Sequence, residues 1–151
     1  MEAVGAVANV LELGKTAWAI SAALYKLYRD TQNVNQTVEY LAKETRALAY
    51  ACETIHEELR EIVGDSAHKT SLYDKDGHLW LRISEQTKEC EVTLGKLSAI
   101  VDKVQEHGSN IFEQGRRQIR LNMRQEEIAG IRSRVQTHTQ SLQTILLVVN
   151  M

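Results

Sequence analysis

The side chains able to carry chemistry are few in this sequence, and they form no recognisable catalytic group. Cys52 and Cys90 lie far apart and match no metal-ligand spacing. The motifs of phosphate-binding loops, dinucleotide-binding folds, zinc proteases and serine hydrolases are absent. Because no nucleophile is paired with a base, we expect no enzymatic activity and no cofactor.

His138 and the two cysteines fall on apolar positions of helical segments. A partly buried, hydrogen-bonded histidine and two small hydrophobic thiols are the expected interpretation. A pH-sensing role for His138 is the alternative. No signal peptide is recognised at the N-terminus, so we expect a cytoplasmic chain with both thiols reduced.

The segment around Asp74, Asp76 and Gly77 partly matches a calcium-binding loop. However, Leu72 stands at the first ligand position and Ile83 at the position of the bidentate glutamate. We interpret the segment as a solvated turn and expect no metal.

A run of basic residues, RRQIRLNMR, contains no acidic residue. Its arginines are Arg116, Arg117, Arg120 and Arg124. A solvated helix face is one interpretation; a patch for anionic lipid headgroups or an acidic partner is the other. Nucleic acid is not expected, because no aromatic platform accompanies the arginines and the net charge is -2.

The composition predicts few, long elements to position these side chains. The 151 residues include no proline, where average usage gives about seven or eight. Apolar positions alternate by four and three residues in segments 33–63, 78–107 and 114–149, which is a heptad seam in each. Such seams must pack on one another. We predict an all-α, antiparallel bundle of four to five long helices, forming a single domain over residues 1–151.

The first helix, residues 1–29, is amphipathic and rich in alanine and glycine. Its length would allow a membrane span. However, Glu12 and Lys15 near its middle would cost roughly 2.5–3.5 kcal/mol each in a bilayer, which disfavours a lone span. In an oligomer both charges could face a polar lumen. The alternative is a helix that simply packs its apolar face in the bundle.

The N-terminal pattern MEAVGAVANVLELGKTAWAISAALYKLY resembles the start of the fungal HeLo-like domains, which form the N-terminal domain of many fungal STAND (NLR-like) receptors. The last segment, EEIAGIRSRVQTHTQSLQTILLVV, resembles the closing helix of that family, and the segment with Cys90, Leu94 and Leu97 fits its spacing more loosely. HeLo and HeLo-like domains are helical bundles that execute or signal regulated cell death in fungi. Their architecture is similar to the four-helix domain of the mixed-lineage kinase-like necroptosis effector.

The resemblance implies a domain that rests in the cytoplasm, self-associates on a signal from an NLR-like or amyloid-forming partner, and then inserts its first helix into the plasma membrane. Glu12 would be the acidic position that such pore-forming helices carry. The candidate insertion residues are Val4, Gly5, Val7, Val10, Leu11, Glu12, Leu13, Gly14, Trp18 and Leu24. The candidate contacts to anionic phospholipids are Lys15, Lys26, Arg29, Arg116, Arg117, Arg120 and Arg124. The alternative function is a helical adaptor or oligomerisation module that needs no membrane.

Overall fold

The computed structural model describes residues 2–30, 36–65, 78–105 and 125–149, and all of them are helical. The helices are α1 (Glu2–Asp30), α2 (Gln36–Asp65), α4 (His78–Gln105) and α6 (Gln125–Val149). The predicted all-α class is confirmed, and the described residues form four helices rather than five. The second helix, predicted over residues 33–63, extends to Asp65, so Gly64 lies within α2. The predicted start of the last helix at residue 114 falls outside the described residues.

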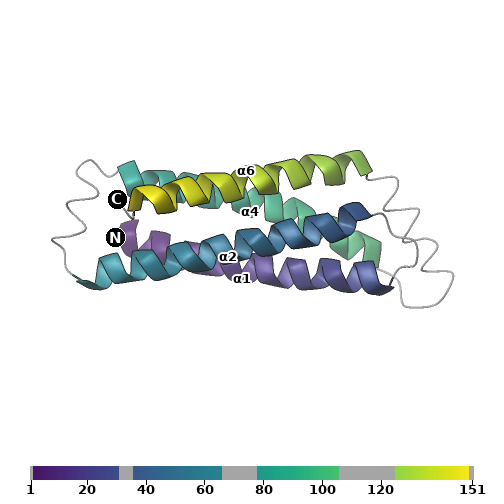
Figure 1. Cartoon of the computed structure of the whole chain (residues 1–151), viewed down its shortest axis with the longest axis horizontal. Helices are drawn as coiled ribbons and strands as arrows, with labels where there is room; N and C mark the ends of the chain where they lie inside the picture. Colours follow the sequence, from purple (N-terminus) through teal and green to yellow (C-terminus); the bar gives the residue numbers. More distant parts are fainter. Residues whose placement is uncertain (1, 31–35, 66–77, 106–124, 150–151) are drawn as a thin grey trace.

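The four helices run alternately up and down along one long axis (Figure 1). Helix α1 packs against α2 and α4, and α6 packs against the same two helices from the opposite side. The most extensive interface joins α1 to α2. Charged residues stabilise two of the helix ends, because Glu126 and Glu127 lie in the first turn of α6 and Arg29 lies in the last turn of α1, where each complements the helix dipole.

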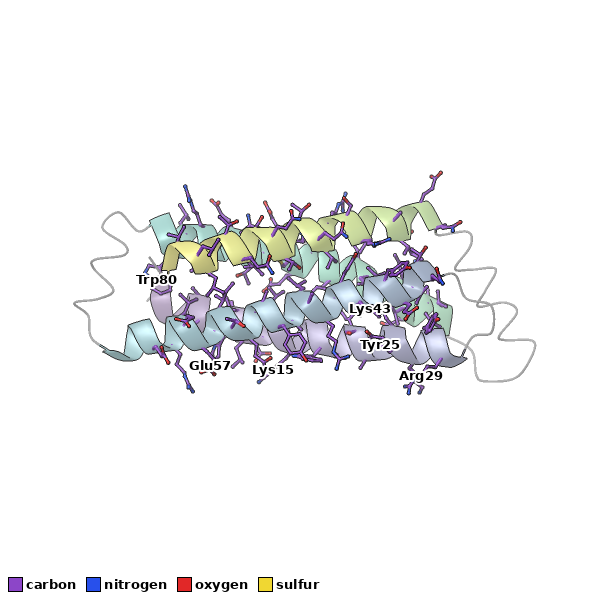
Figure 2. The ribbon with its side chains drawn as sticks, viewed as in Figure 1. Lys15, Tyr25, Arg29, Lys43, Glu57 and Trp80 are labelled. Atoms are coloured by element: carbon purple, nitrogen blue, oxygen red, sulfur yellow. The ribbon has the colours of Figure 1, made fainter. Side chains whose placement is uncertain are left out.

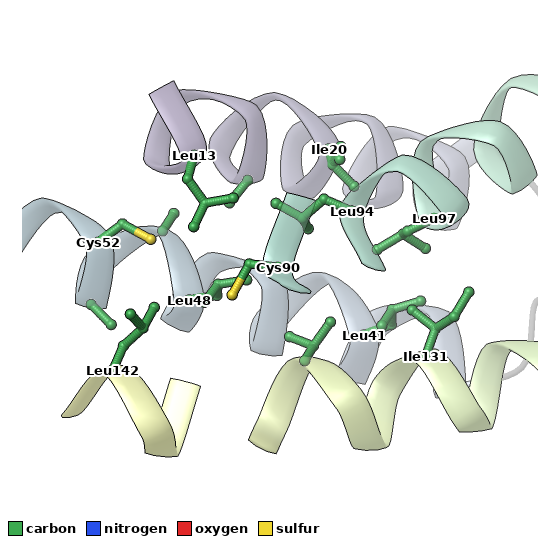
Figure 3. Close-up of a cluster of buried hydrophobic side chains, with 14 of the residues drawn as sticks. Leu13, Ile20, Leu41, Leu48, Cys52, Cys90, Leu94, Leu97, Ile131 and Leu142 are labelled. Atoms are coloured by element: carbon green, nitrogen blue, oxygen red, sulfur yellow. The ribbon is translucent and has the colours of Figure 1, made fainter. Parts of the chain in front are cut away.

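The heptad seams of α2, α4 and α6 lie in the core, as the spacing predicts, together with buried residues of α1 such as Leu13 and Ile20 (Figure 3). Leu48, Leu97 and Leu142, from three different helices, are completely buried. Each such side chain contributes about 1.5–3 kcal/mol when it leaves water. The remaining seam residues that are buried are Val38, Leu41, Cys52, Ile55, Leu59, Ile83, Cys90, Leu94, Val101, Val104, Ile128, Ile131, Val135 and Ile145.

Threonines occupy core positions without leaving a polar atom unpaired. Thr45 Oγ1 donates a hydrogen bond to the Leu41 carbonyl at 2.7 Å, and Thr87 Oγ1 donates to the Ile83 carbonyl at 2.6 Å. Each bond runs back four residues along the same helix, so the hydroxyl is satisfied locally and the methyl group faces the core. Thr45 interrupts the row of apolar residues in the heptad seam of α2, but it can be buried there because its hydroxyl is hydrogen-bonded.

Helices α1 and α2 approach each other closely at Gly14. A Cβ atom added there would lie 3.2 Å from Cys52 Cβ and 3.8 Å from the Ala49 carbonyl oxygen. Ser21 Oγ crosses the same interface and donates to the Ala42 carbonyl at 3.0 Å. Small residues on both helices, including Ala17 on α1, permit this spacing. Gly14 is thus explained by packing, whereas Gly95 and Gly130 face open space.

Substitutions at these glycines should separate packing from helix propensity. We expect Gly14→Leu to lower the free energy of unfolding by about 1–3 kcal/mol, because the side chain must push α1 away from α2. Gly95→Ala should raise it by up to about 1 kcal/mol, because alanine favours the helix and nothing obstructs its methyl group. Urea unfolding of both variants checks the pair, and equal stability of Gly14→Leu and the wild type would contradict the close approach.

Candidate functional site

The residues predicted to form an insertion helix lie in α1, and most of its apolar side chains face the bundle. Val10, Leu13 and Leu24 are buried. Gly14 is also buried, while Val7, Leu11 and Trp18 are half-buried, Gly5 and Glu12 are exposed, and the side chain of Val4 lies outside the described residues. In this structure α1 is therefore a bundle helix with its apolar face covered.

The buried face of α1 includes small residues that are not among the candidate insertion residues named from the sequence. Ala6, Ala17 and Ser21 are buried together with Ile20 and Leu27. Alanine and serine have low hydrophobicity, so a hydropathy pattern does not show which of them are buried. Their burial follows from the close approach of α2, which only the paired structure shows.

The charged side chains of α1 that the structure describes, Glu12, Lys15, Lys26 and Arg29, are exposed; Lys15 and Arg29 are labelled in Figure 2. Lys15 Nζ lies 3.6 Å from Glu12 Oε1 within the helix, and both side chains are largely exposed, so this pair adds little stability. None of these four side chains forms an ion pair with another helix.

Helices α2 and α6 are joined by a polar network centred on Glu44. Arg132 Nε donates to both carboxylate oxygens of Glu44, at 3.0 and 3.1 Å, and Gln136 Nε2 donates to Glu44 Oε1 at 2.6 Å. The Arg132 guanidinium also lies 5.0 Å from the centre of the Tyr40 ring. This network cross-links two helices that the sequence analysis linked only through their seams.

Several predicted features cannot be placed. Arg116, Arg117, Arg120 and Arg124 lie outside the described residues, as does the segment with Asp74 and Asp76. Within the described helices, His, Cys, Asp and Glu side chains form no group of three that could hold a metal. No helix among them combines the length and apolar character needed to cross a bilayer.

An open groove lies on the outer surface between α1 and α2. It has a volume of about 390 Å³ and is lined by Trp18, Ser21, Ala22, Tyr25, Arg29 and Arg46. The Arg46 guanidinium lies 5.2 Å from the centre of the Trp18 ring and 5.8 Å from that of Tyr25. Sequence reasoning missed Arg46, because it lies on α2 outside the seam and gains its aromatic neighbours only through pairing with α1.

The two cysteines are buried, and neither is poised for thiol chemistry. Burial raises the pKa of each thiol, Cys52 and Cys90, to about 12. Both therefore stay protonated at neutral pH, which makes them poor nucleophiles. The small hydrophobic role expected from the sequence fits this environment.

His138 on α6 forms the polar contact inside the α4–α6 interface. Its Nε2 lies 2.9 Å from Thr93 Oγ1, and that hydroxyl lies 3.1 Å from the Glu89 carbonyl. If the hydroxyl donates to the carbonyl, Nε2–H of neutral His138 donates to the hydroxyl and both groups are satisfied. Burial lowers the pKa of His138; the Glu89 charge opposes this shift and Arg134 adds to it.

The fold and these sites define an all-α bundle with an aromatic and cationic groove between α1 and α2. Comparison with known protein families, with curated proteins and with solved structures finds no match to this chain. The function must therefore be argued from the site itself.

The burial of His138 predicts a pH dependence of stability. Its pKa is lower in the folded protein than the value of about 6.5 in an unfolded chain, so the unfolded state binds more protons below that pH. We expect the free energy of unfolding to fall as the pH drops below about 6.5 and through the lowered folded pKa.

The variant His138→Leu removes this titration, while Thr93 keeps its bond to the Glu89 carbonyl. Its free energy of unfolding should depend less steeply on pH between about 6.5 and the folded pKa. Denaturant unfolding across this pH range measures both proteins. Parallel curves would show that His138 titrates alike in the folded and unfolded states.

Proposed function

We propose that this chain is a membrane-targeting, cell-death-inducing domain in which α1 is the element that leaves the bundle and inserts when the protein oligomerises. The observation that carries the proposal is the character of α1. It is the most apolar of the four described helices. Its charged side chains Glu12, Lys15, Lys26 and Arg29 make no ion pair with another helix. The resemblance to fungal HeLo-like domains supports the same reading.

Insertion would have to occur in an assembly. Each of Glu12 and Lys15 carries a cost in a bilayer that a single helix cannot recover. In an oligomer the two charges could line a polar lumen, and the small residues that pack α1 on α2 could pack α1 on other copies of itself. Under this proposal the domain rests in the cytoplasm, and an NLR-like or amyloid-forming partner brings it to the plasma membrane.

A second candidate function is a helical adaptor that associates with other proteins without a membrane. Exposed apolar side chains on α4 and α6 favour it. Leu81 and Leu147 are 56% and 69% exposed, and Val92 and Val148 are also exposed. Such side chains are available for helix–helix contacts in an oligomer without any rearrangement of α1.

Covalent attachment of α1 to α2 distinguishes the two candidates. A Cβ at position 14 would lie 3.2 Å from Cys52 Cβ, within a few tenths of an ångström of the spacing in disulfides. We expect oxidised Gly14→Cys, in a Cys90→Ala background, to lose leakage of anionic vesicles by about tenfold or more, because α1 can no longer separate. Reduction should restore leakage, as followed by release of an encapsulated dye.

The matched control is Gly14→Ala in the same background, treated with the same oxidant, which places a methyl group at the interface but forms no cross-link. The membrane proposal fails if the cross-linked protein leaks vesicles as well as the reduced one. It also fails if the folded wild type, clustered by a fused oligomerisation tag, leaves vesicles sealed. The adaptor function predicts the latter result, together with self-association that is unaffected by the cross-link.

A further inference from the structure

The groove between α1 and α2 carries positive charge that is not paired with an acidic side chain of the described helices. Arg46 and Arg29 both line it, and neither forms an ion pair. Elsewhere on the same helices lysines and arginines do have carboxylate partners, as Lys43 has in Glu39 and Arg60 in Glu57. The groove therefore concentrates two guanidinium groups whose hydrogen-bond donors are available to a ligand.

Arg46 is held in place by aromatic rings rather than by an acid. Its guanidinium lies within 5.8 Å of the ring centres of both Trp18 and Tyr25, at cation–π distance. Trp18 is fixed in turn by an edge-to-face contact with Tyr50, with ring centres 5.0 Å apart. The guanidinium donors of Arg46 have no hydrogen-bond partner among the described residues, and a guanidinium with free donors can bind phosphate oxygens bidentately.

The lining of the groove adds an apolar component. Ala22, Trp18 and Tyr25 line the groove beside the two arginines, whereas the Ser21 hydroxyl is buried and donates to the Ala42 carbonyl. A volume of about 390 Å³ falls within the usual range of small-molecule sites and exceeds what a phosphate group alone would fill. The remaining space suits an apolar body attached to the phosphate.

We infer that the α1–α2 groove is a binding site for a phosphate group joined to an apolar body, with Arg46 as its main ligand and Arg29 as the second. Two sources carry this chemistry: the headgroup of a phospholipid and a soluble phosphate ester. Lys26, exposed on the same helix, favours an extended anionic surface and hence the lipid. The lipid source rests on the proposed function, whereas phosphate binding itself does not.

The site touches both helices that would have to separate. A ligand held by Arg46 of α2 and by Arg29 of α1 binds the resting bundle and not its opened form, so it stabilises the bundle by mass action. The groove would thus hold the resting domain at a phosphate-bearing surface before α1 is released.

Trp18 lines the groove and offers a direct signal. The sequence has two tryptophans, and Trp80 lies toward the opposite end of the bundle from Tyr25 and Arg29 (Figure 2). In a Trp80→Phe variant, Trp18 is the one remaining tryptophan and reports on the part of the surface that contains the groove. The probes are inorganic phosphate, the soluble short-chain ester dibutyryl phosphatidic acid, and vesicles of phosphatidylcholine with or without phosphatidic acid. Vesicles with phosphatidylglycerol test for charge without a phosphomonoester.

We expect the short-chain ester to change Trp18 fluorescence saturably and to bind more tightly than inorganic phosphate. Vesicles with phosphatidic acid should bind more tightly than those with phosphatidylglycerol. Arg46→Gln should weaken the ester by about tenfold or more, since charge-assisted bonds are lost, and Arg46→Lys should recover only part of the affinity. The matched control, Arg134→Gln, removes the same charge from an exposed position on α6, which does not pack against α1, and should bind as the wild type does.

Co-sedimentation of the unaltered chain with the same vesicles provides a second measurement should Trp80→Phe fold poorly. The inference is overturned if neither phosphatidic acid nor its short-chain ester binds, or if Arg46→Gln binds them as the wild type does. Binding of the ester without binding to vesicles supports the phosphate site and overturns the lipid source. These measurements record binding and not leakage. A clustered protein that leaves vesicles sealed would therefore refute the proposed function but would not contradict phosphate binding in the groove.

Discussion

The contact between Gly14 and Cys52 determines how α1 and α2 lie against each other, and much of the molecule depends on it. Without a Cβ at position 14 the two backbones approach closely, and Ser21 on α1 can reach a carbonyl on α2. The same proximity places Arg46 between two aromatic rings of α1. The outer groove is therefore a consequence of backbone spacing that a larger residue at position 14 would alter.

Sequence periodicity was sufficient to predict the bundle and most of its core. Every seam residue of α2, α4 and α6 whose burial the structure describes is buried, including Thr45, Cys90 and His138. Heptad spacing works here because a buried stripe must recur at the helical period whatever the partner helix is. Thr45 and His138 can lie in the buried stripe because each has a hydrogen-bond partner inside the bundle. The partner of Thr45 is the Leu41 carbonyl, and that of His138 is the Thr93 hydroxyl.

The groove could not be predicted in the same way. Periodicity shows which face of a helix is buried, but not which two faces meet. Arg46 becomes a candidate binding residue only because the pairing of α1 with α2 places it beside Trp18 and Tyr25. The cross-link of Glu44 with Arg132 has the same origin, since it joins residues from α2 and α6. On α1 the burial of Ala6, Ala17 and Ser21 was missed because small residues have low hydrophobicity and do not stand out in a hydropathy pattern.

The packing of α1 also constrains any mechanism in which it moves. Its five large buried side chains, each worth about 1.5–3 kcal/mol, together approach the whole stability of a typical domain, about 5–15 kcal/mol. These side chains are Val10, Leu13, Ile20, Leu24 and Leu27. Release would also uncover the surfaces of α2 and α4 that pack against α1. Helix α1 can therefore leave only where both newly exposed surfaces are buried again, and a membrane-bound assembly is an environment that could cover both at once.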